Sequence, residues 1–401
     1  MSTDLIGGLG RRVAREWRAA NHDERRFPAI AAEALADSGV LTEMGVDALV
    51  AWSLGPDVEP TQAQNGFGQP RVVLYRSHEF HVEALFWFDE TTAVHQHSFS
   101  GAFGLLAGSS VHATYDFHVD DRVSARLLLG ELVLRDCEVL EQGDVRPIVA
   151  GPAFIHAQFH LDRPSVSIVV RTGSDPDQNP QYSYLPPSVA VDPFYEPEPM
   201  TTQLLVLDAE AQAGPDRFVA GARRLLVDSD LWLAFKVLER AFAALPAERY
   251  DALEDECGER LGPRARRFRG VFEERRRQRN IVARRGEVDS ADHRFLLALL
   301  LHAPSPAVIR RLVRQRRPGV DPDDQIVTWL GELSARGAIG LDFDPVSLTV
   351  LRAALKGADL AQVEAAMRRA FPVEQVDAQA PNLHLLWDEI QSSVLLQPLF
   401  A

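Results

Sequence analysis

Two histidines separated by one residue, His95 and His97, carry the clearest chemical signal in this sequence. Side chains two positions apart on an extended strand lie on the same face, so both imidazoles point one way while Gln96 points the other. Neutral imidazoles bind divalent transition metals well. A third ligand must come from elsewhere, and His156 in GPAFIHAQFH is best placed, with His160 as the alternative. The sequence therefore predicts a three-histidine metal site.

The position of these histidines indicates the kind of fold that holds them. Eight of the twelve histidines lie between His78 and His160, in a region of short β-branched and aromatic runs separated by Gly, Pro, Asp or Ser. The runs are RVVLY, FHVEALFWF, GAFGLLAG, HATYDFHV, ARLLLGELVL and SVSIVV. This pattern is typical of an all-β barrel or sandwich. Two alternatives to a metal site stay open: hydrogen-bonded strand histidines, and a decayed barrel without metal.

Helical patterns flank the β-rich region. We expect residues 1–60 to form helices that pack on the barrel, and residues 61–172 to form the barrel itself. Residues 173–215 are rich in proline and predict an extended linker. Over residues 216–401 apolar residues recur three and four apart, which predicts an all-α domain. The expected class is therefore α+β, in two domains.

Composition excludes several classes of protein. No apolar run approaches the roughly 18 residues that span a bilayer, and the start MSTDLIGGLG has no signal-peptide pattern. Cys137 and Cys257 are too few for a disulfide framework, so we expect a cytoplasmic protein without a membrane partner. The net charge of −15 argues against binding of nucleic acid.

One segment departs from the acidic balance. Arg260 to Arg285 contains eleven arginines, interrupted by Glu273 and Glu274. We interpret it as a solvated helix with internal ion pairs. A basic interaction face is the alternative, and it would suit a ligand-binding or sensor module with a helical output domain.

The histidine pattern resembles the cupin superfamily, and within it the three-histidine thiol dioxygenases of the cysteine dioxygenase type, over about residues 70–172. The first motif is His95-Gln96-His97 followed by Gly101 and Gly108, and the second is Gly143, then Gly151-Pro152, then His156. Many cupins have a glutamate ligand a few residues after the histidine pair, where this chain has Gly101 or Ala102. The thiol dioxygenases also lack this glutamate. The resemblance implies a jelly-roll barrel with Fe(II), and it makes Phe80 and Trp87 part of the strand before the pair.

The resemblance also implies residues that bind substrate. Tyr75 and Arg76 resemble a tyrosine and arginine that hold a substrate carboxylate, and Arg171 is a second candidate for a bidentate grip. Each of the two arginines could instead form a strand-edge salt bridge, and Tyr75 could be a core residue. The chain departs from the family at Val169 and Arg171, where the dioxygenases have a histidine and a tyrosine. That departure removes the evidence for cysteine itself as the substrate.

Three further polar residues belong to the predicted site. His81, Glu83, Leu85 and Trp87 share one strand face, so Glu83 is a candidate ligand or partner of a ligand if that face is the interior. Glu83 could instead be exposed on the barrel exterior. His160 and Gln158 share a face with His156 and are candidates for the same roles.

The sequence thus predicts a mononuclear Fe(II)-dependent oxygenase that acts with O₂ on a small or peptide-borne carboxylate or thiol. Zn(II) on the same histidines would instead favour a hydrolase or lyase. A cupin ligand-binding or sensor module is the alternative from another class. The helical half would supply a lid, a docking surface or a homodimer interface.

Overall fold

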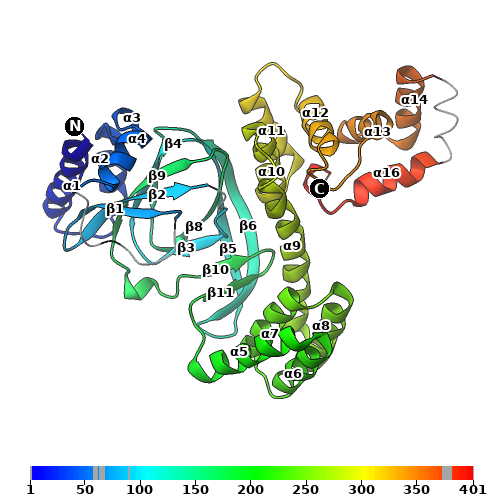
Figure 1. The fold of residues 1–401 in the computed structure, drawn as a ribbon, viewed down its shortest axis with the longest axis horizontal. Coiled ribbons are helices and arrows are strands. Elements are labelled where there is room, and N and C mark those ends of the chain that lie inside the picture. Colours follow the sequence, from blue (N-terminus) through cyan, green and yellow to red (C-terminus); the bar gives the residue numbers. More distant parts are fainter. Residues whose placement is uncertain (1, 57–61, 63–67, 89–90, 373–381, 401) are drawn as a thin grey trace.

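A computed structural model describes residues 2–56, 62, 68–88, 91–372 and 382–400 of the chain. An antiparallel β-barrel forms most of the N-terminal half, with helices beside it (Figure 1). The β-rich region predicted from the short runs is confirmed, as is the α+β class.

Two sheets build the barrel. The first has five antiparallel strands, in the order β1 (Arg71–Arg76), β2 (Phe80–Trp87), β9 (Ser165–Thr172), β4 (Gly101–Ala107) and β7 (Val145–Ile148). The second closes on itself, in the order β10 (Ser183–Leu185), β11 (Val189–Val191), β6 (Leu127–Leu140), β5 (Ser110–Arg122), β8 (Gly151–His160) and β3 (His95–His97). The strands that carry the histidines therefore belong to the second sheet and face the first.

Alternation along β2 shows which side of the first sheet is the interior. Val82, Ala84 and Phe86 pack in the core under the N-terminal helices, whereas Leu85 and Trp87 pack inside the barrel. The helices that cover the outer face are α1 (Ser2–Ala19), α2 (Phe27–Asp37), α3 (Val40–Glu43) and α4 (Val46–Ser53). Helices α1 to α4 thus share one hydrophobic core with the outer face of the first sheet.

The proline-rich segment is where the structure differs most from expectation. Residues 173–215 were expected to form an extended linker, but they contain β10 and β11, together with η1 (Pro176–Gln178) and α5 (Glu198–Ala213). β10 pairs with β3 through Ser183 and His95, and β11 pairs with β6. The segment therefore completes the barrel beside β3, the strand that carries His95 and His97.

The remaining helices form two groups joined by the long helix α9 (Pro263–Arg285), which runs beside the barrel (Figure 1). The first group is α5, α6 (Pro215–Val227), α7 (Leu231–Ala244) and α8 (Ala247–Leu261). The second is α10 (Ala291–His302), α11 (Pro306–Arg316), α12 (Pro322–Ala335), α13 (Pro345–Leu355), α14 (Leu360–Ala370) and α16 (Leu383–Ser392), followed by η3 (Gln397–Leu399). No described helix is both long and apolar enough to cross a membrane.

The helical half shares its hydrophobic core with the barrel. Val111, Tyr115 and Phe159 of the barrel belong to the same buried cluster as Phe295 and Leu330 of the helices. A second cluster joins β6 and β11 to helices α5 to α9. The chain is therefore less clearly divided into two domains than the sequence suggested, because the outer face of the second sheet is covered by helices.

The arginine-rich segment is largely paired. On α9, Arg275 binds Glu239, Arg276 binds Asp251 and Arg277 binds Glu274. The buried Arg285 donates to the carbonyl oxygen of His160, and so ties α9 to the end of β8. The expected ion pairs are present, but those of Arg275 and Arg276 join α9 to α7 and α8 instead of lying within the helix. Arg277 and Arg285 are buried, so the expectation of a solvated helix is wrong, and α9 anchors the barrel.

Candidate metal centre

The structure brings His95, His97 and His156 together. His95 and His156 face each other across the β3–β8 pairing, and one ring nitrogen from each of the three histidines lies within 4.8 Å of the others. The Nε2 atoms of His97 and His156 are 2.9 Å apart. Two ligands at right angles around an ion, each about 2.1 Å from it, would be roughly 3.0 Å apart. The predicted three-histidine group is present, and its third member is His156.

The donor atoms of this group fit a metal ion. His95 donates from Nδ1 to the carbonyl oxygen of Ala93 at 2.8 Å, so its Nε2 carries the lone pair. That Nε2 is buried and has no hydrogen-bond partner among the described residues, and the same holds for Nδ1 of His97. Buried nitrogens without partners are costly, and ligation of an ion would satisfy His95.

Burial keeps these imidazoles neutral. Desolvation lowers the pKa of His95. It lowers the pKa values of His97 and His156 well below their usual range, with further lowering from neighbouring charges. Only a neutral imidazole has a lone pair for a metal. The site therefore holds its ligands in the form that a divalent cation needs.

The cavity beside the histidines is small and mainly apolar. Its volume is about 40 Å³, room for only a few water-sized groups. Its walls are apolar side chains with a few polar groups between them; the apolar residues are Leu85, Trp87, Phe99, Phe103, Ile148 and Val169. Such a space admits the reacting end of a small molecule and excludes bulk water.

Glu83 faces this cavity, the interior position that was one of two alternatives left open by the sequence, but it does not join the histidine group. It is 3% exposed and binds Arg71, His81 and Arg171. Burial alone would raise the pKa of Glu83, but the hydrogen bond from His81 and the charges of the two arginines lower it below its usual value. Glu83 is therefore an ionised anchor for two arginines and lies outside the three-histidine group.

Arg171 lies at the edge of the site. Its Nε donates to Glu83 at 3.1 Å, and its guanidinium lies 4.4 Å from the ring centroid of Phe99, which in turn packs against His97. Among the described residues its Nη1 and Nη2 have no hydrogen-bond partner. Burial and the nearby Arg71 lower the pKa of Arg171. The side chain is fixed by Glu83 and retains two donors for a ligand.

The other two predicted catalytic residues lie elsewhere. Tyr75 stacks on Phe80, with ring centroids 5.8 Å apart, in the core under the N-terminal helices. A Cβ on Gly10 of α1 would overlap the Tyr75 ring. Tyr75 is a core residue here, so the role in substrate binding is corrected. Arg76 is exposed at the end of β1, close enough to Arg171 to act on its pKa.

The two residues that share a strand face with His156 have separate positions. Gln158 lines the cavity, and its buried amide nitrogen has no partner in the described part of the chain. His160 stacks on Trp87, with ring centroids 4.8 Å apart, and bonds to Ser165 at 3.0 Å. Burial lowers the pKa of His160 to about 3. Gln158 is thus placed to donate to a ligand, whereas His160 lies outside the histidine group.

The lack of a glutamate ligand has a structural cause. A Cβ at Gly101 would overlap the carbonyl oxygen of Val170, and the side chain of Ala102 packs in the core under the helices. Phe103 is the residue on this strand that faces the cavity. Neither position suggested by the resemblance can therefore present a carboxylate to the histidines.

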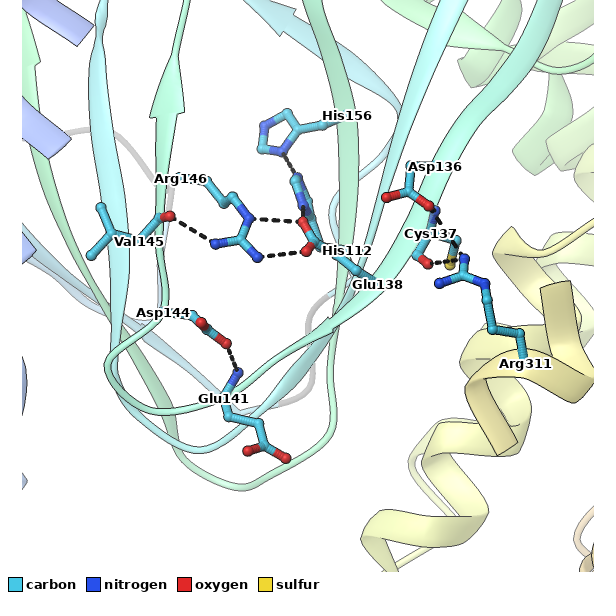
Figure 2. Close-up of polar contacts among 10 residues, drawn as sticks. All are labelled: His112, Asp136, Cys137, Glu138, Glu141, Asp144, Val145, Arg146, His156 and Arg311. Carbon is cyan, nitrogen blue, oxygen red and sulfur yellow. Dashed lines mark hydrogen bonds and ion pairs between the residues drawn. The ribbon is translucent and has the colours of Figure 1, made fainter. Parts of the chain in front are cut away.

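The sequence reasoning missed His112 and Glu138. His112 Nε2 lies 3.1 Å from Nδ1 of His156, and His112 Nδ1 lies 3.1 Å from Glu138. Arg146 donates to both carboxylate oxygens of Glu138, at 2.9 and 2.5 Å (Figure 2). The alternation of HATYDFHV placed His112 on a strand, but only the pairing of three strands brings it to His156.

Comparisons with known proteins add little to this geometry. No family model matches the chain, and no curated protein does. Among solved structures, one described as DMSP lyases RdDddP and RnDddQII is 14% identical, covers 44% of this chain and 96% of its own, and has a TM-score of 0.25. DMSP lyase DddQ from Ruegeria pomeroyi DSS-3 is 17% identical, covers 37% of this chain and 73% of its own, and has a TM-score of 0.23. At these scores neither likeness carries an inference about the reaction.

Proposed function

We propose that this chain is a mononuclear metal-dependent enzyme of the cupin type that oxidises a small anionic substrate with O₂, using Fe(II) on His95, His97 and His156. The convergence of three neutral, buried imidazoles supports this proposal most strongly. Fe(II) supplies one-electron and O₂ chemistry, and three neutral ligands leave it its full charge and open coordination positions.

The protein residues would bind and orient the substrate. Arg171 presents two donors beside Phe99, a geometry suited to a bidentate grip on a carboxylate. Gln158 offers an amide donor inside the cavity. Apolar walls keep water from the reacting end of the substrate, which strengthens both polar contacts. The substrate class is therefore a small carboxylate, with or without a thiol.

Metal analysis of anaerobically purified protein is the first test. We expect about one iron per chain in the wild type and a loss of iron in His95→Ala, His97→Ala and His156→Ala. His118→Ala is the control, because His118 is exposed farther along β5. Stoichiometric zinc would overturn the oxygenase and favour a hydrolase or lyase. No metal after reconstitution with Fe(II) would overturn the metal enzyme altogether.

Oxygen uptake with a panel of small thiols and carboxylates is the second test. Arg171→Lys keeps the charge but loses the planar two-donor fork, so we expect the KM for the substrate to rise while iron content stays that of the wild type. Iron without uptake of O₂ for any compound would favour the ligand-binding or sensor module. The expected homodimer through the helical half stays a prediction.

A further inference from the structure

We propose that His112 and Glu138 are positioning residues that fix the tautomer and the ring orientation of His156. This inference rests on the proposed metal site, since it concerns how one ligand of that site is held. The four residues form a chain from the site to the barrel surface, in the order His156, His112, Glu138 and Arg146 (Figure 2).

The direction of the hydrogen bonds follows from Glu138. Burial alone would raise the pKa of Glu138, but hydrogen bonds from Arg146 and His112 lower it to about 2. Glu138 is therefore a carboxylate that can only accept. The contact of 3.1 Å between Glu138 and Nδ1 of His112 then requires a proton on that nitrogen.

The next bond in the chain follows from the geometry of His112, which is 1% exposed. Its Nδ1 is committed to Glu138, so Nε2 is the ring nitrogen that can accept a hydrogen bond. That Nε2 lies 3.1 Å from Nδ1 of His156, so His112 is placed to accept from His156.

The consequence for His156 is a lone pair on Nε2, the nitrogen that faces His97 at 2.9 Å. His95 is fixed in the same sense by the carbonyl oxygen of Ala93. His97 has no such partner on Nδ1 among the described residues, so no hydrogen bond at that nitrogen fixes its tautomer. Hydrogen bonds to Nδ1 thus fix the tautomers of two of the three predicted ligands, His95 and His156.

The strands and rings around the chain hold its geometry. His112 is paired directly with Glu138 between β5 and β6, and its other neighbour β8 carries His156. Phe154 packs on the His156 ring with centroids 4.5 Å apart, and Phe103 lies 5.6 Å from His112. Next to Glu138, Arg311 of α11 donates to the carbonyl oxygen of Cys137 at 2.8 Å (Figure 2). The helical half therefore supports the strand that carries Glu138.

The decisive experiment determines the histidine tautomers in the metal-free protein by long-range ¹H–¹⁵N NMR, together with the affinity for Fe(II) or Co(II). We expect the wild type to carry the His156 proton on Nδ1. In His112→Phe, which keeps a ring but removes the acceptor, the proton moves to Nε2. We expect metal affinity to fall about 10- to 100-fold, as when other supporting partners of metal ligands are lost.

Two variants sharpen the test. His112→Gln places an amide where Nε2 of His112 lies, so it should retain the Nδ1 proton of His156 and much of the affinity. Glu138→Gln changes a half-buried residue and serves as the milder substitution if His112→Phe does not fold. In this variant we expect a mixture of the two His156 tautomers. His118→Phe, on the same strand but exposed, is the matched control and should leave tautomer and affinity unchanged.

The outcomes separate the two proposals. A His156 proton that stays wholly on Nδ1 in both His112→Phe and Glu138→Gln, with unchanged metal affinity, overturns the positioning role. A wild type that binds no metal overturns the proposed function, while the tautomer shift measured in the metal-free protein still decides whether His112 positions His156.

Discussion

Replacing Glu83 with glutamine should destabilise the fold more than any surface charge change, because it removes the carboxylate between two buried arginines. The side chain of Glu83 is 4% exposed, and those of Arg71 and Arg171 are 7% and 18% exposed. Breaking a buried ion pair by removal of one partner costs about 3–5 kcal/mol, since the remaining charge is left without compensation. We therefore expect Glu83→Gln to lower the free energy of unfolding by about that amount.

Urea unfolding at pH 7 measures this difference. Glu210→Gln is the matched control, because Glu210 forms a two-bond pair with Arg217 on the surface, and exposed pairs contribute about 0–1 kcal/mol. If the free energy of unfolding of Glu83→Gln falls by an amount within about 1 kcal/mol of that of the control, then Glu83 does not stabilise Arg71 and Arg171 as argued.

The same variant has a defined dependence on pH. In the folded protein the pKa of Glu83 lies below the ordinary glutamate value of 4.5. A carboxylate with a lowered pKa binds protons more readily when unfolded, so its contribution is full above pH 4.5 and is lost as the pH falls through the folded-state pKa. The deficit of Glu83→Gln should shrink over that acidic range and stay constant above it.

Three further outcomes are expected. Removal of metal with EDTA should lower the thermal midpoint of the wild type, because metal at 100 times its Kd adds about 2.7 kcal/mol to the free energy of unfolding. The thermal midpoint of His95→Ala should not change with EDTA. Burial lowers the pKa of His302 from 6.5 to about 3, so the contribution of this residue to stability is full above pH 6.5 and falls as the pH drops. The free energy of unfolding of the wild type should therefore decrease by about 2 kcal/mol between pH 7 and 5 because of His302. Denaturant curves of His302→Gln should lack this pH-dependent decrease. Gly101→Ala should lower stability by about 1–3 kcal/mol in the same assay, because its methyl group meets the carbonyl oxygen of Val170.

Local patterns in the sequence were enough to predict the barrel strands and the core of the site. The β-branched and aromatic runs each became a strand, because alternation along a strand depends only on neighbouring residues. The spacing of His95 and His97 fixed their common face for the same reason. The same alternation placed Glu83 on one face with Trp87 but left open whether that face was the interior, where the structure has it.

Several other features that depend on pairing between distant strands were not predicted. Tyr75 shares the helix-covered side with Leu74 because the register of β1 and β2 shifts between Val73 and Tyr75, and no single-strand pattern reveals such a bulge. β10 has three residues in a proline-rich context and is stabilised by contact with His95. His112 gained its place at the site from its position between β6 and β8.

The distribution of charge around the three histidines, from the cavity to the barrel surface, bears on the ligand that a metal site here would retain. Glu83 is surrounded by Arg71 and Arg171, and Glu138 is paired with Arg146. These two clusters hold three guanidinium groups and two carboxylates, an excess of one positive charge next to three neutral histidines. A divalent ion on the histidines would add two more positive charges in a space with apolar walls. Because unbalanced charge in a low-dielectric space is costly, an anion at Arg171 would offset that cost, although the molecule as a whole has a net charge of −15.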